Sequence, residues 1–164
     1  MKDIIIRQVC SGDIETICAI AVSAWRGIHD GYRKYIGNDD LAERLSRNWQ
    51  AGKARQIREK AERSPDMVLV AELNGKIVGF TTFDMNKETG IGEICNNAVA
   101  PDCQGMGIGS AQHAKVLEIF RLHGMKYAIV STGYEDEGHA RARASYEKAG
   151  FKKMKTSITY SLKL

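Results

Sequence analysis

The chain has 164 residues, with 24 basic and 20 acidic side chains and a net charge of +4. This length suits one domain with a buried core. The mild positive balance favours anionic small molecules and does not by itself indicate a nucleic-acid-binding protein. No apolar run approaches the roughly 20 residues that cross a bilayer. The N-terminal stretch MKDIIIRQVCSGD is too short in apolar residues for a secretory signal. We therefore expect a cytoplasmic protein without a membrane partner, with residues 1–164 forming a single domain.

The four cysteines are Cys10, Cys18, Cys95 and Cys103. None forms a CxxC pair, and no histidine stands at zinc-finger spacing, so we expect no metal site. A chain of this size without a secretory signal is also a poor candidate for a disulfide framework. The sequence therefore predicts reduced thiols that serve mainly as packing residues.

The first third of the chain predicts one strand followed by helices. The β-branched run DIIIRQV is typical of a strand. Ser11 can cap a following helix, in which apolar residues recur at helical spacing from Ile14 to Ile28. The stretch HDGYRKYIGNDD breaks this pattern and indicates a loop or a short bent element. From Leu41 to Arg63 the residues favour one charged helix, which Pro65 ends.

The remainder alternates strands and helices. The two runs MVLVAEL and IVGFTTFD flank Asn74-Gly75, which is a strong hairpin signal. IGEICNNAVA predicts another strand. The segment from Ile108 to His123 predicts a helix that Gly124 ends, and KYAIVST predicts a further strand. HARARASYEKAG predicts the last helix, and FKKMKTSITYSL one or two closing strands. A hairpin sheet combined with strand–helix–strand crossovers is typical of an α+β (mixed α/β) fold. We expect a central mixed, mostly antiparallel sheet of six to seven strands with helices on both faces.

The stretch PDCQGMGIGS joins a predicted strand to a predicted helix and holds three glycines. A helix N-terminus offers unpaired N–H groups and positive potential, and glycine lets a phosphate approach the main chain. The sequence therefore predicts an anion-binding loop. A Walker P-loop is excluded because no Gly-Lys-Ser/Thr occurs. A dinucleotide fingerprint fits poorly, since it would end on Ser110 and no acidic residue follows near the required distance.

The loop does match Q/R-x-x-G-x-G/A, with Gln104, Gly107 and Gly109 in the defining places. This resembles the acetyl-CoA loop of the GNAT superfamily of N-acetyltransferases. NNAVAP before the loop resembles the fourth strand of that family, and ARASYEKAGF resembles its closing helix and strand. The resemblance extends over nearly the whole chain, with its specific motifs between about Glu93 and Phe151.

The resemblance implies an acetyl-CoA-dependent transferase that acetylates a primary amine by direct attack in a ternary complex. The backbone of Ala98 and Val99 would pair with the pantetheine arm of the cofactor. The backbone of the loop would hold its pyrophosphate. The loop residues are Gln104, Gly105, Met106, Gly107, Ile108, Gly109 and Ser110.

The last predicted helix places His139, Ala142 and Tyr146 within roughly 60° of one another, at about 100° per residue. These three residues would line the cofactor. Tyr146 matches the tyrosine that the family uses as the acid for the departing thiolate, although a tyrosine with its ring in the core is the alternative. His139 stands where the family commonly has asparagine. A neutral imidazole offers the same donor and acceptor, and a surface helix cap is equally compatible with it.

Glu93 stands six residues before Val99 and resembles the general base of the histone-acetyltransferase-like members. Strand alternation places Glu93, Cys95, Asn97 and Val99 on one face, unless a bulge near Asn96–Asn97 shifts the pattern. Glu135 competes for the same role, and a positioned water would also suffice.

The sequence indicates little about the acceptor. The family builds its variable substrate wall between Trp25 and Asp40, where this chain has Trp25, His29, Tyr32 and Tyr35. Aromatic rings suit a cationic amine, either a small molecule or a peptide, although an exposed loop explains the same residues. Two other functions remain open: a nucleic-acid-binding module, which we do not expect, and a CoA-binding sensor of the same fold without turnover. The sequence also leaves open whether the chain forms a homodimer.

Overall fold

The computed structural model describes residues 4–134 and 137–164, without the side chains of residues 32 and 33. The strands are β1 (Ile4–Gln8), β2 (Val68–Leu73), β3 (Lys76–Asn86), β4 (Ile91–Val99) and β5 (Tyr127–Val130). The α-helices are α1 (Ile14–Asp30), α2 (Tyr32–Ile36), α3 (Asp39–Ser46), α4 (Trp49–Arg63), α5 (Ile108–Leu122) and α6 (Ala140–Lys148). Short 3-10 turns cover Ser11–Asp13, Pro65–Met67, Pro101–Cys103 and Glu137–His139.

The strands form one mixed sheet in the order β1-β2-β3-β4-β5. The first four strands pair antiparallel, and β5 joins β4 in parallel. The hairpin between β2 and β3 turns at Asn74 and Gly75, with φ values of 52° and 75°, the left-handed pair that a type I′ turn requires. The prediction of a mixed, mostly antiparallel sheet is confirmed, but the expected six to seven strands are wrong for the described residues, which form five.

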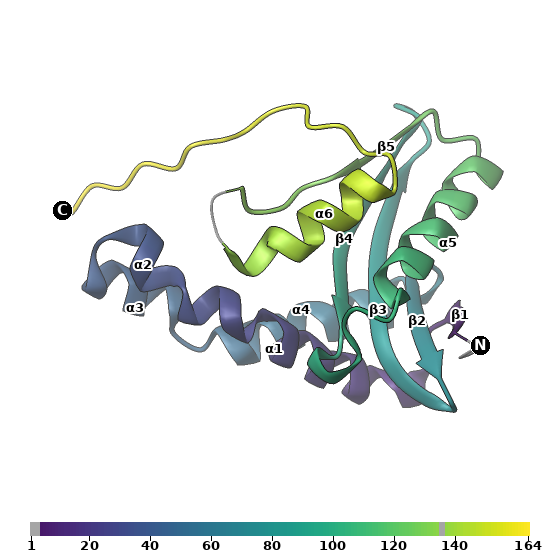
Figure 1. The fold of residues 1–164 in the computed structure, drawn as a ribbon, viewed down its shortest axis with the longest axis horizontal. Coiled ribbons are helices and arrows are strands. Elements are labelled where there is room, and N and C mark those ends of the chain that lie inside the picture. Colours follow the sequence, from purple (N-terminus) through teal and green to yellow (C-terminus); the bar gives the residue numbers. More distant parts are fainter. Residues whose placement is uncertain (1–3, 135–136) are drawn as a thin grey trace.

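The missing strands are those expected after α6. Residues 152–164 have no assigned secondary structure, although apolar side chains alternate with polar ones along them. The apolar members are exposed, with Tyr160 at 87% and Leu162 at 84%. Figure 1 shows this yellow segment running away from the sheet toward the end of the molecule that holds α2 and α3. Alternation gives a segment the right residues for a strand, but a strand also needs a neighbour with matching backbone groups, and no strand of the described residues pairs with this segment.

The single helix expected from Leu41 to Arg63 is two helices, α3 and α4. The break falls at Asn48, whose φ of 56° and ψ of 24° are left-handed. Asparagine tolerates this conformation better than most residues, so the chain can turn here without glycine. The predicted α5 is confirmed; it ends at Leu122, and Gly124, two residues on, has a φ of 73° that turns the chain away.

Two helical layers cover the sheet. Helices α1 and α4 pack on one face, where Ile17 and Ile57 join Phe80 in a buried cluster. Helix α5 covers the other face, where Val116 and Phe120 pack with sheet residues. Figure 1 shows α1 to α4 gathered on one side of the strands and α5 on the other, with α6 crossing in front of β4 and β5. None of the helices in the described chain is long and apolar enough to cross a membrane.

Candidate functional site

Strands β4 and β5 pair over a short distance and then separate. Their parallel register runs from Ile91 and Tyr127 to Ile94 and Val130. Strand β4 then continues to Val99, whereas β5 ends at Val130. The later part of β4 therefore has no strand on its β5 side among the described residues. A flexible ligand with amide groups can pair with such an edge as an additional strand would.

A β-bulge lies at the point of separation. Strand β3 pairs Thr82 with Asn96 but the next residue, Phe83, with Ile94, so Cys95 is the extra residue of β4. One extra residue inverts the alternation of side chains beyond it. The bulge that the sequence left open near Asn96–Asn97 therefore exists, one residue earlier.

The bulge separates side chains that strict alternation had placed together. The Asn97 amide donates to Oε1 of Gln112 on α5, at 3.1 Å. Glu93 is paired across the sheet with Asp84, whose carboxylate bonds Lys60 on α4. The expectation that Glu93 shares a face with Asn97 and Val99 is therefore wrong. Glu93 faces the layer of α1 and α4.

The same register decides which backbone groups point into the opening. The N–H of Ala100 donates to the carbonyl of Val78 on β3, at 2.8 Å. Backbone direction alternates along an antiparallel strand, so Ala98 also directs its backbone groups toward β3. The groups that point toward the opening belong to Asn97 and Val99. Ala98 and Val99 were expected to pair with a pantetheine arm. The backbone groups of Val99 point toward the opening, whereas those of Ala98 point toward β3.

The glycine loop follows directly at the wide end of the opening. Gly105 and Gly107 have φ values of 81° and 82°, a conformation that residues with a Cβ rarely adopt. Gly107 is the N-cap of α5, so the unpaired N–H groups of Ile108, Gly109 and the next residue begin there. The loop thus presents glycine backbone and unpaired N–H groups together, and anion binding there stays a prediction.

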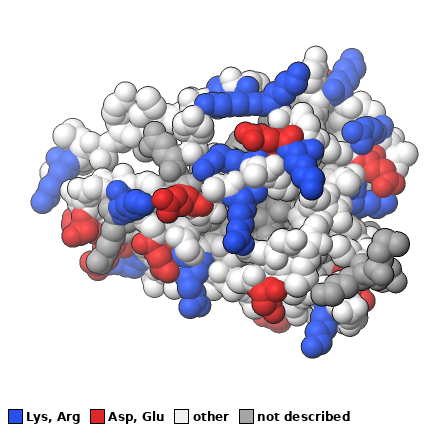
Figure 2. Space-filling view, viewed as in Figure 1, with Lys and Arg blue, Asp and Glu red and all other residues white. Residues whose placement is uncertain are grey.

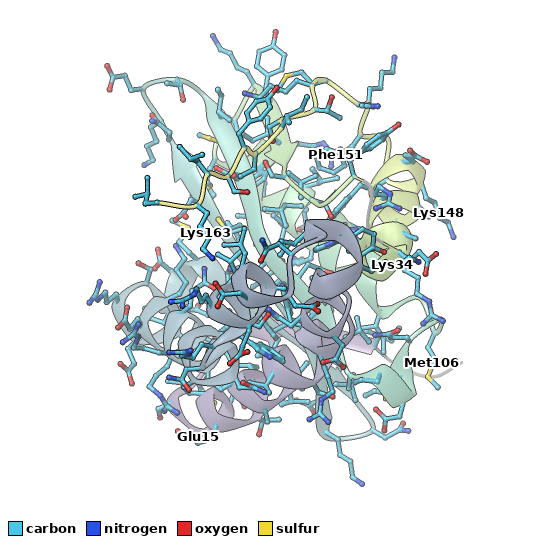
Figure 3. The ribbon with its side chains drawn as sticks, turned by 90° about the vertical axis from the view of Figure 1, so that its left-hand side faces the viewer. Glu15, Lys34, Met106, Lys148, Phe151 and Lys163 are labelled. Atoms are coloured by element: carbon cyan, nitrogen blue, oxygen red, sulfur yellow. The ribbon has the colours of Figure 1, made fainter. Side chains whose placement is uncertain are left out.

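Two further contacts fix the loop against the strands and α6. The Gln104 amide donates to the carbonyl of Val99, at 3.3 Å, and accepts from Arg141 on α6. A Cβ on Gly109 would stand 3.9 Å from both the amide oxygen of Asn97 and the hydroxyl of Ser145. Gln104 therefore holds the loop, and Gly109 lies in the space between β4 and α6, where a methyl group would make ordinary contacts. In Figure 3, Met106 at the loop tip and Lys148 on α6 lie on the same side of the molecule, and Met106 points outward.

A buried polar cluster on α5 supports this region, and no pattern in the sequence predicts it. Gln112 bonds Asn97 and also donates to the carbonyl of Ala98, at 3.4 Å. It fits because Gly79 has no side chain: a Cβ there would lie 2.8 Å from the Gln112 amide nitrogen. One residue on, Nδ1 of His113 lies 3.2 Å from the Ser145 hydroxyl. Together these contacts tie α5 to β4 through Asn97 and Ala98 and to α6 through Ser145.

Tyr146 projects from α6 onto this cluster. Its ring centroid lies 4.9 Å from that of His113 and 6.0 Å from that of Phe151. Burial raises the pKa of Tyr146 to about 12, so the phenol keeps its proton at neutral pH. Ala142 lies on the same helix, but His139 ends the preceding 3-10 turn and is the N-cap of α6. The predicted helical stripe therefore holds only Ala142 and Tyr146.

A lysine of α4 lies against the other face of β4, and the sequence shows it only as one of several basic residues of a charged helix. Nζ of Lys53 on α4 lies 3.0 Å from Oδ1 of Asn96 and 4.1 Å above the ring centroid of Trp25. Desolvation lowers the pKa of Lys53 to about 8. Trp25, predicted to meet a cationic acceptor, thus already holds an ammonium group of this chain.

The other residues of the predicted acceptor wall are spread out. His29 stacks on Trp49 with ring centroids 4.1 Å apart. The Tyr35 hydroxyl accepts from the N–H of Glu137, at 2.9 Å. Figure 3 shows Lys34 reaching toward the start of α6, where it pairs with Glu137. The side chain of Tyr32, and the whole of the alternative base Glu135, lie outside the described residues.

Two other features bear on the chemistry. An open hollow of about 540 Å³ between α1, α3 and α4 is lined by His29 and Trp49 among others, and it touches neither the loop nor β4.

Cys95 lies at the bulge itself. Its Sγ donates to the carboxylate of Asp84, at 3.2 Å. Desolvation first, and that carboxylate second, raise the pKa of the Cys95 thiol to about 12, so it is not a ready nucleophile. Within residues 4–134 and 137–164, no cluster of histidine, cysteine and carboxylate side chains could hold a metal.

Comparison with known proteins gives this geometry a family context. Residues 34–151 match the sequence profile of the Acetyltransferase (GNAT) family. A mycothiol acetyltransferase of Stackebrandtia nassauensis is 34% identical over 104 residues, which cover 61% of this chain and 33% of the relative. An uncharacterised N-acetyltransferase of Methanocaldococcus jannaschii is 28% identical over 156 residues, which cover 92% of this chain and 62% of the relative. The chain thus spans less than two thirds of the length of either relative.

The fold also has close structural counterparts. The crystal structure of the PaiA N-acetyltransferase from Thermoplasma acidophilum, in complex with coenzyme A, superposes with a TM-score of 0.72. The match covers 94% of this chain and 93% of that chain, at 18% sequence identity. At this identity the likeness concerns the fold.

Proposed function

The chain belongs to the GNAT family of acetyltransferases, and from this premise we propose that it transfers the acetyl group of acetyl-CoA to a primary amine. The observation that carries the proposal is the separation of β4 from β5 beside a glycine loop that begins α5. That arrangement offers an amide-pairing edge and an anion site in one line, as an elongated ligand with a charged end requires. We further propose that residues 1–164 act as one domain.

The residues present fit this donor. The N–H groups of loop residues 104–110 would hold the pyrophosphate, because Gly105 and Gly107 adopt left-handed φ values and bring no side chain. The backbone of Asn97 and Val99 would pair with the amides of the pantetheine arm. Ala142 is small, which leaves room for the arm beside α6. When bound, the donor supplies an activated acetyl group on a thioester, with a thiolate as the leaving group.

Tyr146 would act on the leaving group. It keeps its proton at neutral pH, since burial raises its pKa to about 12. An ordinary thiol has a pKa of about 8.5, so complete proton transfer from this phenol to a thiolate is unfavourable. We therefore assign Tyr146 to hydrogen-bond donation that stabilises the departing sulfur. Its contact with His113 fixes the ring for this role.

The acceptor amine would arrive from the opposite face of the sheet. Glu93 faces that side and is the candidate base for removing the proton of an incoming ammonium group. The ammonium of Lys53 near Asn96 would also favour loss of that proton, because a fixed positive charge disfavours a second positive charge close by. Transfer would be direct rather than through an acyl-enzyme, since the raised pKa of Cys95 leaves its thiol protonated at the bulge.

The test is release of free thiol from acetyl-CoA in the presence of a panel of primary amines, including amino acids, polyamines and peptides. We expect turnover with at least one class and a loss of about 10²-fold or more for Tyr146→Phe and Glu93→Gln. Tyr127→Phe is the matched control, because Tyr127 is 70% exposed on β5. Unchanged activity in both site variants would refute the assigned roles. Tight CoA binding without turnover on any amine would favour the alternative, a sensor of the same fold.

A further inference from the structure

Lys53 is a partly buried lysine whose described partners are all neutral. Its Nζ donates to Oε1 of Gln56 and to Oδ1 of Asn96, both at 3.0 Å, and lies over the ring of Trp25. No carboxylate of the described chain forms an ion pair with it. Lys60, two turns further along α4, pairs with Asp84 instead. The two lysines share a helix but have opposite electrostatic surroundings.

Asn96 places the Lys53 amine at the narrow end of the opening. The last paired position of β4 and β5 is Ile94, and Asn96 is the first residue after the bulge. Its side-chain amide is held in one orientation, because Nδ2 donates to Oγ1 of Thr82 at 3.1 Å and Oδ1 accepts from Lys53. The amine therefore has a fixed position where the two strands part.

This position is also where the reactive end of the donor would lie under the proposed function. The pyrophosphate end lies at the loop, and the arm follows β4 back toward the bulge. From Asn96 to Ala100 an extended strand covers about 13 Å, at roughly 3.3 Å per residue, a length suited to an extended pantetheine arm. Figure 2 shows several basic side chains, with acidic ones between them, about the middle of the face where, in Figure 1, α6 and α1 lie opposite each other.

Lys53 has the chemistry of an acceptor as well as its position. Desolvation lowers its pKa to about 8, so about a tenth of the side chains are uncharged at pH 7 and about half at pH 8. Only the uncharged amine has the lone pair that attacks a carbonyl carbon. A lysine in an ion pair favours its charged form and lacks this reactivity.

We propose that Lys53 is a self-acetylation site. After the ammonium gives one proton to solvent, Nζ forms a bond to the acetyl carbonyl carbon and the bond from that carbon to the CoA sulfur breaks. The thiolate leaves, the second proton that Nζ loses neutralises it, and the products are N-acetyl-Lys53 and CoA. The modified side chain has no charge and keeps one N–H. It therefore loses the cation–π contact with Trp25 and fills the space through which an amine acceptor would enter.

The proposal rests on the proposed use of acetyl-CoA, and its test needs no knowledge of the acceptor. The folded protein is incubated with acetyl-CoA alone, and the modified lysines are identified by peptide mass spectrometry. We expect one acetyl group per chain, on Lys53, formed at least about tenfold faster than on any other lysine because the amine and the donor are held together. Lys53→Arg should abolish this modification, and Lys60→Arg, the control on the same helix, should retain it.

Two further conditions separate directed transfer from nonspecific acylation. Desulfo-CoA, which cannot carry an acetyl group, should suppress modification of Lys53 when it occupies the loop. Unfolding the chain in urea should remove the preference for Lys53. Equal labelling of many lysines, or labelling of Lys53 that desulfo-CoA leaves unchanged, would overturn the proposal.

The outcome also distinguishes this proposal from the proposed function. Thiol release with an amine acceptor but no acetyl group on Lys53 would reject self-acetylation and leave the transferase function in place. Absence of thiol release, of labelling and of CoA binding would reject both.

Discussion

The buried histidine of α5 makes the stability of the protein depend on pH in a way that can be measured. His113 is 1% exposed, its Nδ1 bonds the Ser145 hydroxyl, and its Nε2 has no hydrogen-bond partner within the described chain. Burial lowers the pKa of His113 to about 4, because the charged imidazolium would lose its hydration there. The native protein therefore holds this side chain neutral at pH values where an unfolded chain would protonate it.

The pKa values of His113 in the native and unfolded states give the direction and size of the change in stability with pH. An unfolded histidine titrates near 6.5, so below that pH the unfolded state binds a proton that the native state does not. Native stability is greatest above pH 6.5 and falls with decreasing pH down to about 4. The loss attributable to His113 is about 1.4 kcal/mol per pH unit in that range, which amounts to about 2 kcal/mol at pH 5.

Urea unfolding at pH 7.5 and pH 5 tests this for the wild type and two variants. His113→Asn keeps a hydrogen-bonding group near Ser145 but cannot titrate, so its free energy of unfolding should fall about 2 kcal/mol less than that of the wild type between the two pH values. His123→Asn removes an exposed histidine from the end of the same helix and should behave like the wild type. If His113→Asn keeps the full pH dependence of the wild type, the argument from burial is wrong.

Two glycine positions give further predictions. A Cβ on Gly92 would lie 2.7 Å from the Phe120 ring, so Gly92→Ala should lower the free energy of unfolding by about 1–3 kcal/mol. Phe120→Leu should then cost less in the alanine background than in the wild type, and simple additivity in denaturation experiments would contradict the clash. Gly107→Ala should weaken CoA binding measured by calorimetry. Gly124→Ala, which has a similar left-handed φ but lies outside the loop, should only reduce stability, and equal binding losses in the two variants would contradict an anion site at Gly107.

Features that rest on local backbone chemistry could be predicted from the sequence. The hairpin at Asn74 and Gly75 and the turn at Gly124 that follows α5 both depend on residues that accept a left-handed φ. The glycine loop was identified for the same reason, since its chemistry is that of its own backbone. The break at Asn48 has the same cause and was missed, because helix-forming residues on both sides of it indicate one continuous helix.

Features that depend on a partner elsewhere in the chain could not be predicted in this way. Residues 152–164 have the alternation of a strand, yet no described strand pairs with them. His113 lies within a helix whose sequence does not reveal that Ser145 and Tyr146 pack on it. Lys53 is one of many basic residues between Glu43 and Arg63, and only the packing of α4 against β4 separates it from its neighbours.

The bulge at Cys95 lets one strand present side chains to both substrates of the proposed reaction. Before the bulge, Glu93 faces the layer of α1 and α4; beyond it, the inverted alternation directs Asn96 to that same layer and Asn97 to α5. A regular strand would place Asn97 on the face of Glu93. With the bulge, the groups proposed for the donor lie toward α5 and α6, and those proposed for the acceptor lie toward α1 and α4. The two reactants can then meet at the point where β4 leaves β5, each approaching from its own side.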